Sequence, residues 1–372
     1  MNHQHTRRDL LKSAGLAAAG SAIGLLGIAR THAAEGDKPE ITIAGYKSFD
    51  RCAALADGRV EVAGFDHRFE AAGIGDMNTH VFSGPGTREV TEVGLHPFML
   101  AYANEGFRDY SLLPVFPLRL FRHKSIFIRT DRGITKPADL KGRKVGTPGF
   151  SSTSLTWLRG IMEHEYSVKQ GDIEWVVSSK DSSADVSGKI SKQESMVPEG
   201  LSVSKGPDGK DESQMLVDGD VDALFHAAEP KAYVEGNSIV GRLFPDFRTT
   251  ERAYFAETGI FPIMHVVAMR NEVIEKHPEL PKALFEAYSQ AKKLAYVALA
   301  KSGWADISLP WIAQEIEETG EAMGENFWSY GIKDNKETLN ALCQYSYEQG
   351  FVTRKLSIEN LFHSSTLEFD EA

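Results

Sequence analysis

Four consecutive hydroxyl residues, Ser151 to Ser154, stand at the start of a stretch with helical periodicity. The stretch runs to Tyr166, and its apolar side chains recur at the spacing of one helix face. Free backbone N–H groups at a helix start attract an anion, so we expect a ligand carboxylate at Ser152, Thr153 and Ser154. The simpler alternative is that one hydroxyl caps the helix. Four hydroxyls exceed what one cap needs, which favours the binding interpretation.

A basic cluster of Arg119, Arg122 and His123 comes just before a β-rich run at Ser125–Arg129. A guanidinium can hold a carboxylate through two parallel hydrogen bonds, which suits recognition of an aromatic acid. The alternative is a solvated basic turn, where most surface charges belong.

Two further pairs of polar residues follow predicted strands. Glu92 and His96 lie at a strand-to-helix junction, the edge at which open α/β sheets bind ligands. Either could be a general acid or a hydrogen-bond partner, although a lone helical histidine is more often structural. His226 and Glu229 follow the strand predicted at 222–225 and are similarly placed.

Three aromatic residues are candidates to stack on a ring-bearing ligand: Tyr46, Phe261 and Trp157. Such residues more often belong to the core, so we expect about one of the three to touch the ligand. The sequence contains no nucleophile triad, Walker loop or dinucleotide fingerprint, and no closely spaced metal-ligand motif. We therefore expect neither a metal nor another cofactor.

The first 34 residues combine a twin-arginine pattern at Arg7 and Arg8, an apolar run from Ser13 to Ala29, and small residues at the end. This pattern predicts a signal peptide that exports the protein by the twin-arginine route to the periplasm. The run is short and glycine-rich for a membrane span, so we expect a soluble mature protein. Cys52 and Cys343 could form a disulfide there, or stay reduced if the chain folds before export.

Charge restricts the partners. The first 34 residues carry a net charge of +3, so the remainder carries −14 where the whole chain of 372 residues carries −11. This acidity argues against nucleic acid or anionic lipid as partners. It leaves room for a small anionic ligand in a locally cationic pocket.

In the remaining residues, patterns typical of strands alternate with patterns typical of helices, which predicts an α/β protein with two open sheets. We expect strand-like runs at 40–45, 65–71, 90–93, 112–120, 125–129, 172–177 and 260–269, and a long helix at 281–300. Residues 178–213 are rich in Ser, Lys, Asp and Gly, which predicts a mobile surface loop or hairpin.

Several segments carry a resemblance to a known family. "PADLKGRKVG", "MLVDGDVDALFHAAEP" and "TGIFPIMHVVAMRNEVIEKHPEL" resemble the type II periplasmic-binding-protein fold, a two-lobed venus flytrap with a ligand cleft between the lobes. "LLPVFPLRLFRHKSIFIRTDRGI", "STSLTWLRGIMEHEY" and "LPWIAQEIEETGEAMGENFWSYGI" resemble, more narrowly, the 4,5-dihydroxyphthalate decarboxylases and their solute-binding relatives. The resemblance covers nearly everything after Lys38.

The resemblance implies a domain division and a set of cleft residues. Lobe 1 would comprise residues 38–130 and 261–372, and lobe 2 residues 131–260. Arg122 and His123 match an Arg-His pair of the family, and His265 would face the cleft where the chain crosses between the lobes. The helix start at Ser152–Ser154 would lie at the same cleft.

Two functions are consistent with this scaffold, which serves both binding proteins and enzymes. The first is a periplasmic solute-binding protein that delivers an aromatic or other small carboxylate to an ABC-type importer. The predicted export favours the binding protein, because a decarboxylase that acts on an intracellular intermediate does not need to leave the cell. The second is a decarboxylase that releases CO2 from a dihydroxylated aromatic acid. His123, His96 or His265 would then supply a proton, with Glu92 orienting one of them and Arg122 holding the remaining carboxylate.

Overall fold

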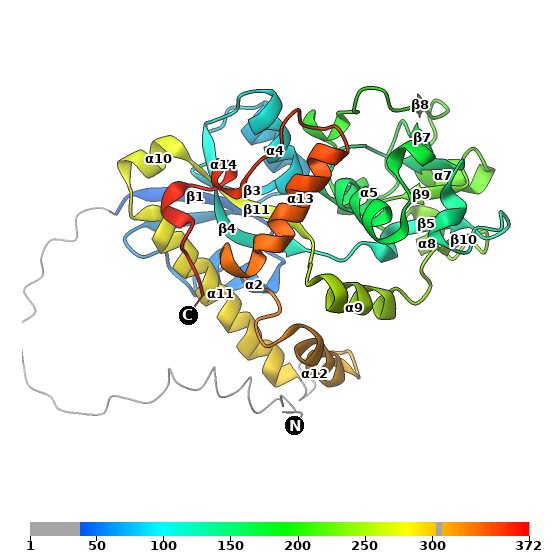
Figure 1. Ribbon diagram of the computed structural model, residues 1–372. Coiled ribbons are helices and arrows are strands. Elements are labelled where there is room, and N and C mark those ends of the chain that lie inside the picture. Colours follow the sequence, from blue (N-terminus) through cyan, green and yellow to red (C-terminus); the bar gives the residue numbers. More distant parts are fainter. Residues whose placement is uncertain (1–37, 303–306, 372) are drawn as a thin grey trace, which may run out of the picture.

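The chain forms two sheets that lie side by side, each surrounded by helices (Figure 1). This computed structural model describes residues 38–302 and 307–371. The predicted signal peptide, residues 1–34, lies outside the described residues. Within the described part of the chain, no helix is long and apolar enough to span a bilayer. The two sheets define lobe 1 and lobe 2.

Lobe 1 is built on a five-stranded sheet in the order β2-β1-β3-β11-β4. Its strands β1, β2 and β3 are parallel, whereas β11 runs antiparallel to both β3 and β4. The bounds are β1 Glu40–Gly45, β2 Asp66–Ala71, β3 Val90–Gly94, β4 Tyr110–Arg119 and β11 Ile263–Arg270. Strand β11 is the return from lobe 2, so it inserts residues from late in the chain between two early strands.

Lobe 2 is built on a six-stranded sheet in the order β10-β5-β9-β6-β7-β8. The bounds are β5 Ile126–Arg129, β6 Lys144–Thr147, β7 Glu174–Val177, β8 Val203–Lys205, β9 Ala223–Phe225 and β10 Val240–Arg242. Because β5 pairs with β9 and β10, the chain enters lobe 2 between Arg119 and Ile126. The expected division at residue 130 places this strand in the other lobe.

The helices follow in chain order. They are α2 Asp50–Ala56, α3 Ile74–Phe82, α4 Leu95–Asn104, α5 Thr153–Tyr166, α6 Ala184–Ser187, α7 Glu212–Asp218, α8 Lys231–Val234, α9 Phe247–Thr258, α10 Asn271–Lys276, α11 Leu280–Lys301, α12 Ile312–Met323, α13 Lys336–Glu348 and α14 Ile358–Leu361. The long amphipathic helix expected at 281–300 is α11.

The cores of the two lobes interlock. Leu100 of α4 and Phe351, after α13, pack in the core of lobe 2, whereas Trp157 of α5 packs in the core of lobe 1. The indole N–H of Trp157 donates to the carbonyl of Ile263 at 3.0 Å. Helix α13 lies alongside α5 between the lobes (Figure 1). At this seam a Cβ on Gly160 would lie 2.0 Å from the Tyr345 ring, so only glycine fits there.

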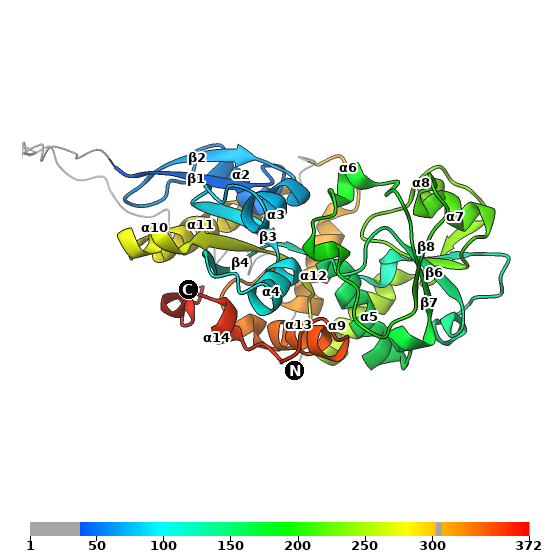
Figure 2. The ribbon, with the colours of Figure 1, turned by 90° about the horizontal axis from the view of Figure 1, so that it is seen from above.

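The insertion, residues 178–213, is more ordered than the sequence predicts. It contains α6, a short 3-10 helix at Gln193–Ser195, and β8, which extends the second sheet beside β7. It also reaches lobe 1, because a Cβ on Gly75 of α3 would lie 2.3 Å from the Lys189 carbonyl oxygen. Figure 2 shows α6 at the gap between the lobes. The segment is therefore an irregular surface segment with three short elements, and its backbone contacts with lobe 1 are not revealed by its polar composition.

Cys52 and Cys343 are both buried and free. Of the two alternatives left open by the sequence, the structure has the reduced one.

Candidate functional site

A buried acid–base pair lies where β11 runs beside β3. His265 sits opposite Gly94 in the antiparallel register, which leaves no side chain between its ring and Glu92, two residues back on the same face of β3. The His265 Nδ1 atom is 2.5 Å from the Glu92 Oε1 atom. Both side chains are largely buried, with exposed fractions of 11% and 3%. The Nε2 atom of His265 is therefore the nitrogen left to exchange a proton with a ligand.

Tyr46, at the end of β1, completes this side of the site. Its ring stacks on the His265 ring at 6.1 Å, and its backbone N–H donates to Glu92 Oε2 at 3.4 Å. Its hydroxyl accepts from the backbone N–H of Ile74 at 2.9 Å. Burial raises the pKa of the Tyr46 phenol, so the ring stays neutral near pH 7. Of the three aromatic candidates, Tyr46 is the one in contact with the acid–base pair.

The insertion brings a second carboxyl group, Glu194, to this pair from lobe 2. Its Oε2 atom accepts from the backbone N–H and the hydroxyl of Ser191, at 2.9 and 2.8 Å. Burial raises the pKa of Glu194, partly opposed by those hydrogen bonds and by nearby His265. A carboxyl group with a raised pKa keeps its proton to a higher pH, as a general acid must.

Asn78 of α3 adds a buried hydrogen-bond donor at the same place. Its Oδ1 accepts from the backbone N–H of Gly94 at 2.9 Å, next to the pair. Its side chain also interacts with the Glu194 carboxyl group and there partly opposes the rise of the Glu194 pKa. Sequence reasoning missed both Asn78 and Glu194, because a lone Asn gives no signal and Glu194 lies in a segment taken for a surface loop.

The hydroxyl residues at the start of α5 divide between two roles. Ser152 is the N-cap, and its hydroxyl accepts from the Leu155 N–H at 3.4 Å. Thr153 Oγ1 accepts from the His96 N–H at 3.0 Å, and Ser154 Oγ donates to the Met264 sulfur at 3.4 Å. Thr153 and Ser154 thus join lobe 2 to lobe 1. The helix start lies at the junction of the lobes, as the resemblance implied.

Arg122 reaches the same junction from the crossover between the lobes. Its Nε donates to the Met264 sulfur at 3.3 Å and its Nη1 to the Ala227 carbonyl at 2.8 Å. Burial lowers the pKa of Arg122 to about 10, so it remains charged near pH 7. The Glu251 carboxylate partly compensates this buried positive charge. Arg119 turns elsewhere, donating to the carbonyls of Phe261 and Ser329.

Two of the predicted histidines are not part of this cluster. His96 is fully buried, with Nδ1 2.7 Å from the Ser151 carbonyl oxygen and Nε2 3.0 Å from the Ser346 hydroxyl. Burial lowers its pKa to about 3, so it is a neutral bridge between the lobes. His123 is enclosed by the rings of Tyr166, Phe244 and Tyr254, which are the contacts of a core residue.

Phe261 and Glu229 also lie in other surroundings. Phe261 stacks on Phe121 at 4.6 Å and packs edge-on against Trp328, within an aromatic cluster. Glu229 is half-exposed and pairs with Arg242. Of the predicted site residues, the structure therefore brings together Glu92, His265 and Tyr46, with Arg122 and the start of α5 at the adjoining junction.

This architecture is the two-lobed fold of type II periplasmic binding proteins. A periplasmic sulfonate-binding protein from Methylobacillus flagellatus superposes with a TM-score of 0.55 at 13% identity, over 89% of this chain and 94% of that one. A variant of the desulfurization enzyme DSZB with biphenyl-2-sulfinic acid superposes at 0.50, with 15% identity over 89% and 98%. A model of the family described as NMT1/THI5 like matches residues 119–193.

Sequence similarity narrows the class. The chain is 32% identical over 321 residues to 4,5-dihydroxyphthalate decarboxylase of Comamonas testosteroni, covering 86% of this chain and 96% of that protein. It is 31% identical over 199 residues to the protein of the same name from Pseudomonas putida, covering 54% and 75%. The chain belongs to the 4,5-dihydroxyphthalate decarboxylase family.

Proposed function

We propose that this protein is a carboxy-lyase that releases CO2 from a hydroxylated aromatic carboxylate of the 4,5-dihydroxyphthalate class. The observation that carries the proposal is the pairing of His265 with Glu92 at 2.5 Å beside Glu194, whose pKa is raised. Loss of CO2 from an aromatic ring needs a base for a ring hydroxyl and an acid for the ring carbon. The site holds one candidate for each role.

The proposed reaction begins with a proton transfer from the ring hydroxyl para to the departing carboxylate. His265 Nε2 accepts that proton, and Glu92 stabilises the imidazolium that forms. The ring becomes a dienone as its para carbon takes a proton from Glu194. The bond from this carbon to the carboxylate then breaks, its electron pair returns to the ring, and CO2 leaves. The hydroxyl regains its proton from His265, and solvent reprotonates Glu194.

Two groups are suited to hold the carboxylate that stays on the ring. Arg122 supplies the buried positive charge, and the start of α5 at Ser154 supplies oriented donors next to it. Asn78 would help to orient Glu194, with which its side chain interacts. These contacts would fix the ring with its departing carboxylate between His265 and Glu194.

The test is incubation of the purified protein with 4,5-dihydroxyphthalate. The proposal expects equal amounts of CO2 and a dihydroxybenzoate with one carboxylate, and loss of both in His265→Gln with ligand binding retained. Binding without CO2 release by the wild-type protein would overturn it.

The predicted export signal favours a second candidate function, capture of an aromatic carboxylate in the periplasm for an ABC-type importer. The fold supports this candidate as well, since a sulfonate-binding protein shares it. Thermal shift with a panel of aromatic carboxylates, together with fractionation of wild-type cells and of an Arg7→Lys/Arg8→Lys variant, tests it. A ligand that raises the melting temperature without turnover, on a periplasmic protein retained inside by the double variant, would support it. Turnover of that ligand would contradict it.

A further inference from the structure

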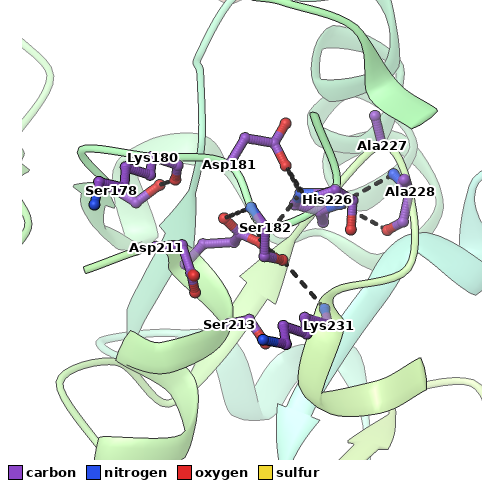
Figure 3. A network of polar contacts seen from close by, with 12 residues as sticks. Ser178, Lys180, Asp181, Ser182, Asp211, Ser213, His226, Ala227, Ala228 and Lys231 are labelled. Carbon is purple, nitrogen blue, oxygen red and sulfur yellow. Dashed lines mark hydrogen bonds and ion pairs between the residues drawn. The ribbon is translucent and has the colours of Figure 1, made fainter. Parts of the chain in front are cut away.

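A separate cluster of metal-ligating side chains lies in lobe 2. Asp181 follows β7, Glu212 is the first residue of α7, and His226 comes directly after β9. Strands β7 and β9 both run parallel to β6, so their carboxyl ends meet at one edge of the sheet. Figure 3 shows Asp181 and His226 pointing toward each other there. Because the three residues come from segments that are distant in the sequence, no local spacing of residues indicates the cluster.

His226 Nε2 lies at the spacing of a shared metal ligand from both carboxylates. His226 Nε2 is 3.1 Å from Asp181 Oδ1 and 3.4 Å from Glu212 Oε1. All three lie within 4.8 Å of one another. A transition-metal ion with bonds of about 2.1 Å holds adjacent ligand atoms roughly 3.0–3.4 Å apart. The side chains of His226 and Glu212 are fully buried, and that of Asp181 is 7% exposed.

Surrounding groups hold each donor in a ligating orientation. His226 Nδ1 lies 2.7 Å from the Ala228 carbonyl oxygen and 3.0 Å from the Ala228 backbone nitrogen, and these contacts hold the ring with Nε2 facing the carboxylates. The Ser182 N–H donates to Glu212 Oε2 at 3.0 Å, and the Ser183 N–H donates to Asp181 Oδ1 at 2.8 Å. Outer contacts of this kind orient the ligands of metal sites.

The buried carboxylates of Asp181 and Glu212 also favour a bound cation. Two carboxylates removed from water are costly unless a positive charge compensates them. A divalent ion bound among them would supply that charge.

We propose that Asp181, Glu212 and His226 bind a divalent transition-metal ion such as Zn²⁺ or Mn²⁺. One imidazole nitrogen and two carboxylate oxygens suit these ions better than Ca²⁺ or Mg²⁺, which take oxygen ligands. The ion would fasten the start of the insertion to α7 and to the end of β9. This site is independent of the acid–base cluster, so neither proposal depends on the other.

The test is titration of the chelator-treated full-length protein with Zn²⁺, Mn²⁺ and Co²⁺, followed by calorimetry and, for Co²⁺, by visible absorption. We expect one equivalent to bind, with Co²⁺ bands of a mixed nitrogen and oxygen ligand set. Glu212→Gln and Asp181→Asn, which keep the side-chain shape, should each weaken binding at least about tenfold. His164→Gln, at the exposed His164–Glu348 pair, is the control and should bind as the wild type does.

Absence of binding to the wild-type protein would overturn the proposal. Equal affinity in the wild type and in both carboxylate variants would overturn it too, because the ion would then be bound elsewhere. If Glu212→Gln does not fold, Asp181→Asn gives the comparison, since Asp181 lies outside the regular elements.

Discussion

At the scale of single residues, two carboxyl groups of the site have different surroundings. Glu92 accepts from His265 and from the Tyr46 backbone N–H. Burial of Glu194 raises its pKa, although the hydrogen bonds from Ser191 and the charge of His265 partly oppose the rise. In many enzymes, different surroundings give two carboxyl groups different roles, so that one acts as a general acid and the other orients or stabilises the base.

Glu194→Gln should lower CO2 release by about 10²–10⁴-fold, the usual contribution of a general acid. The donor is present below its pKa, so the wild-type rate should fall as pH rises through the raised pKa of Glu194, and the variant should lose that limb. Rates across pH 5–9 measure this. Glu199→Gln, exposed on the same insertion, is the control. A wild-type pH profile in Glu194→Gln would remove Glu194 from the chemistry.

His123 provides a residue-scale prediction about stability. Burial lowers its pKa to about 4, and its ring nitrogens have no hydrogen-bond partner in the described chain. In the unfolded chain His123 takes up a proton near pH 6.5, whereas in the folded chain it does so only near pH 4. The free energy of unfolding should therefore fall by up to about 3 kcal/mol as the pH decreases from 6.5 toward 4. His123→Phe should flatten this loss in denaturant titrations while turnover persists. Loss of turnover would instead support the catalytic role suggested by the sequence.

At the scale of elements, the periodicity of the sequence predicted the strands and helices but not the backbone contacts between distant segments. The strand containing Glu92 and the return strand containing His265 were both expected, because each is a run of β-branched and apolar residues. Their adjacency came from the resemblance, since nothing local pairs residues 92 and 265. Glu194 was missed because its position is fixed by backbone, since its carbonyl accepts from the N–H groups of Phe150 and Ser151, and such contacts leave no pattern in the sequence.

Gly75→Ala tests that contact. The new Cβ would meet the Lys189 carbonyl oxygen at 2.3 Å, so the insertion must shift at Lys189, five residues before Glu194, and we expect this shift to disturb Glu194. We expect turnover to fall by about 10²-fold, since a displacement near 1 Å has that effect on positioned groups. The melting temperature should change little, because the clash is relieved at an edge. Gly73→Ala, which meets nothing within 4 Å, is the control, and equal rates in the two variants would contradict the insertion's positioning role.

At the scale of the whole molecule, each lobe contains part of the other's core. Leu100 and Phe351 complete the core of lobe 2, and Trp157 completes that of lobe 1. His96 adds buried hydrogen bonds across the same seam. Relative motion of the lobes is therefore restricted on the side of α5 and α13.

Interlocked cores predict that the lobes unfold together, although the chain has two sheets. Tryptophan fluorescence and far-ultraviolet circular dichroism should give coincident denaturant transitions for the wild type. In Gly160→Ala the new Cβ would lie 2.0 Å from the Tyr345 ring, and such overpacking should cost about 1–3 kcal/mol. The seam would loosen and the two transitions would separate. Gly320→Ala, in a helix position with nothing within 4 Å, should instead stabilise by up to about 1 kcal/mol and keep one transition. Two transitions in the wild type would show that the seam does not couple the lobes.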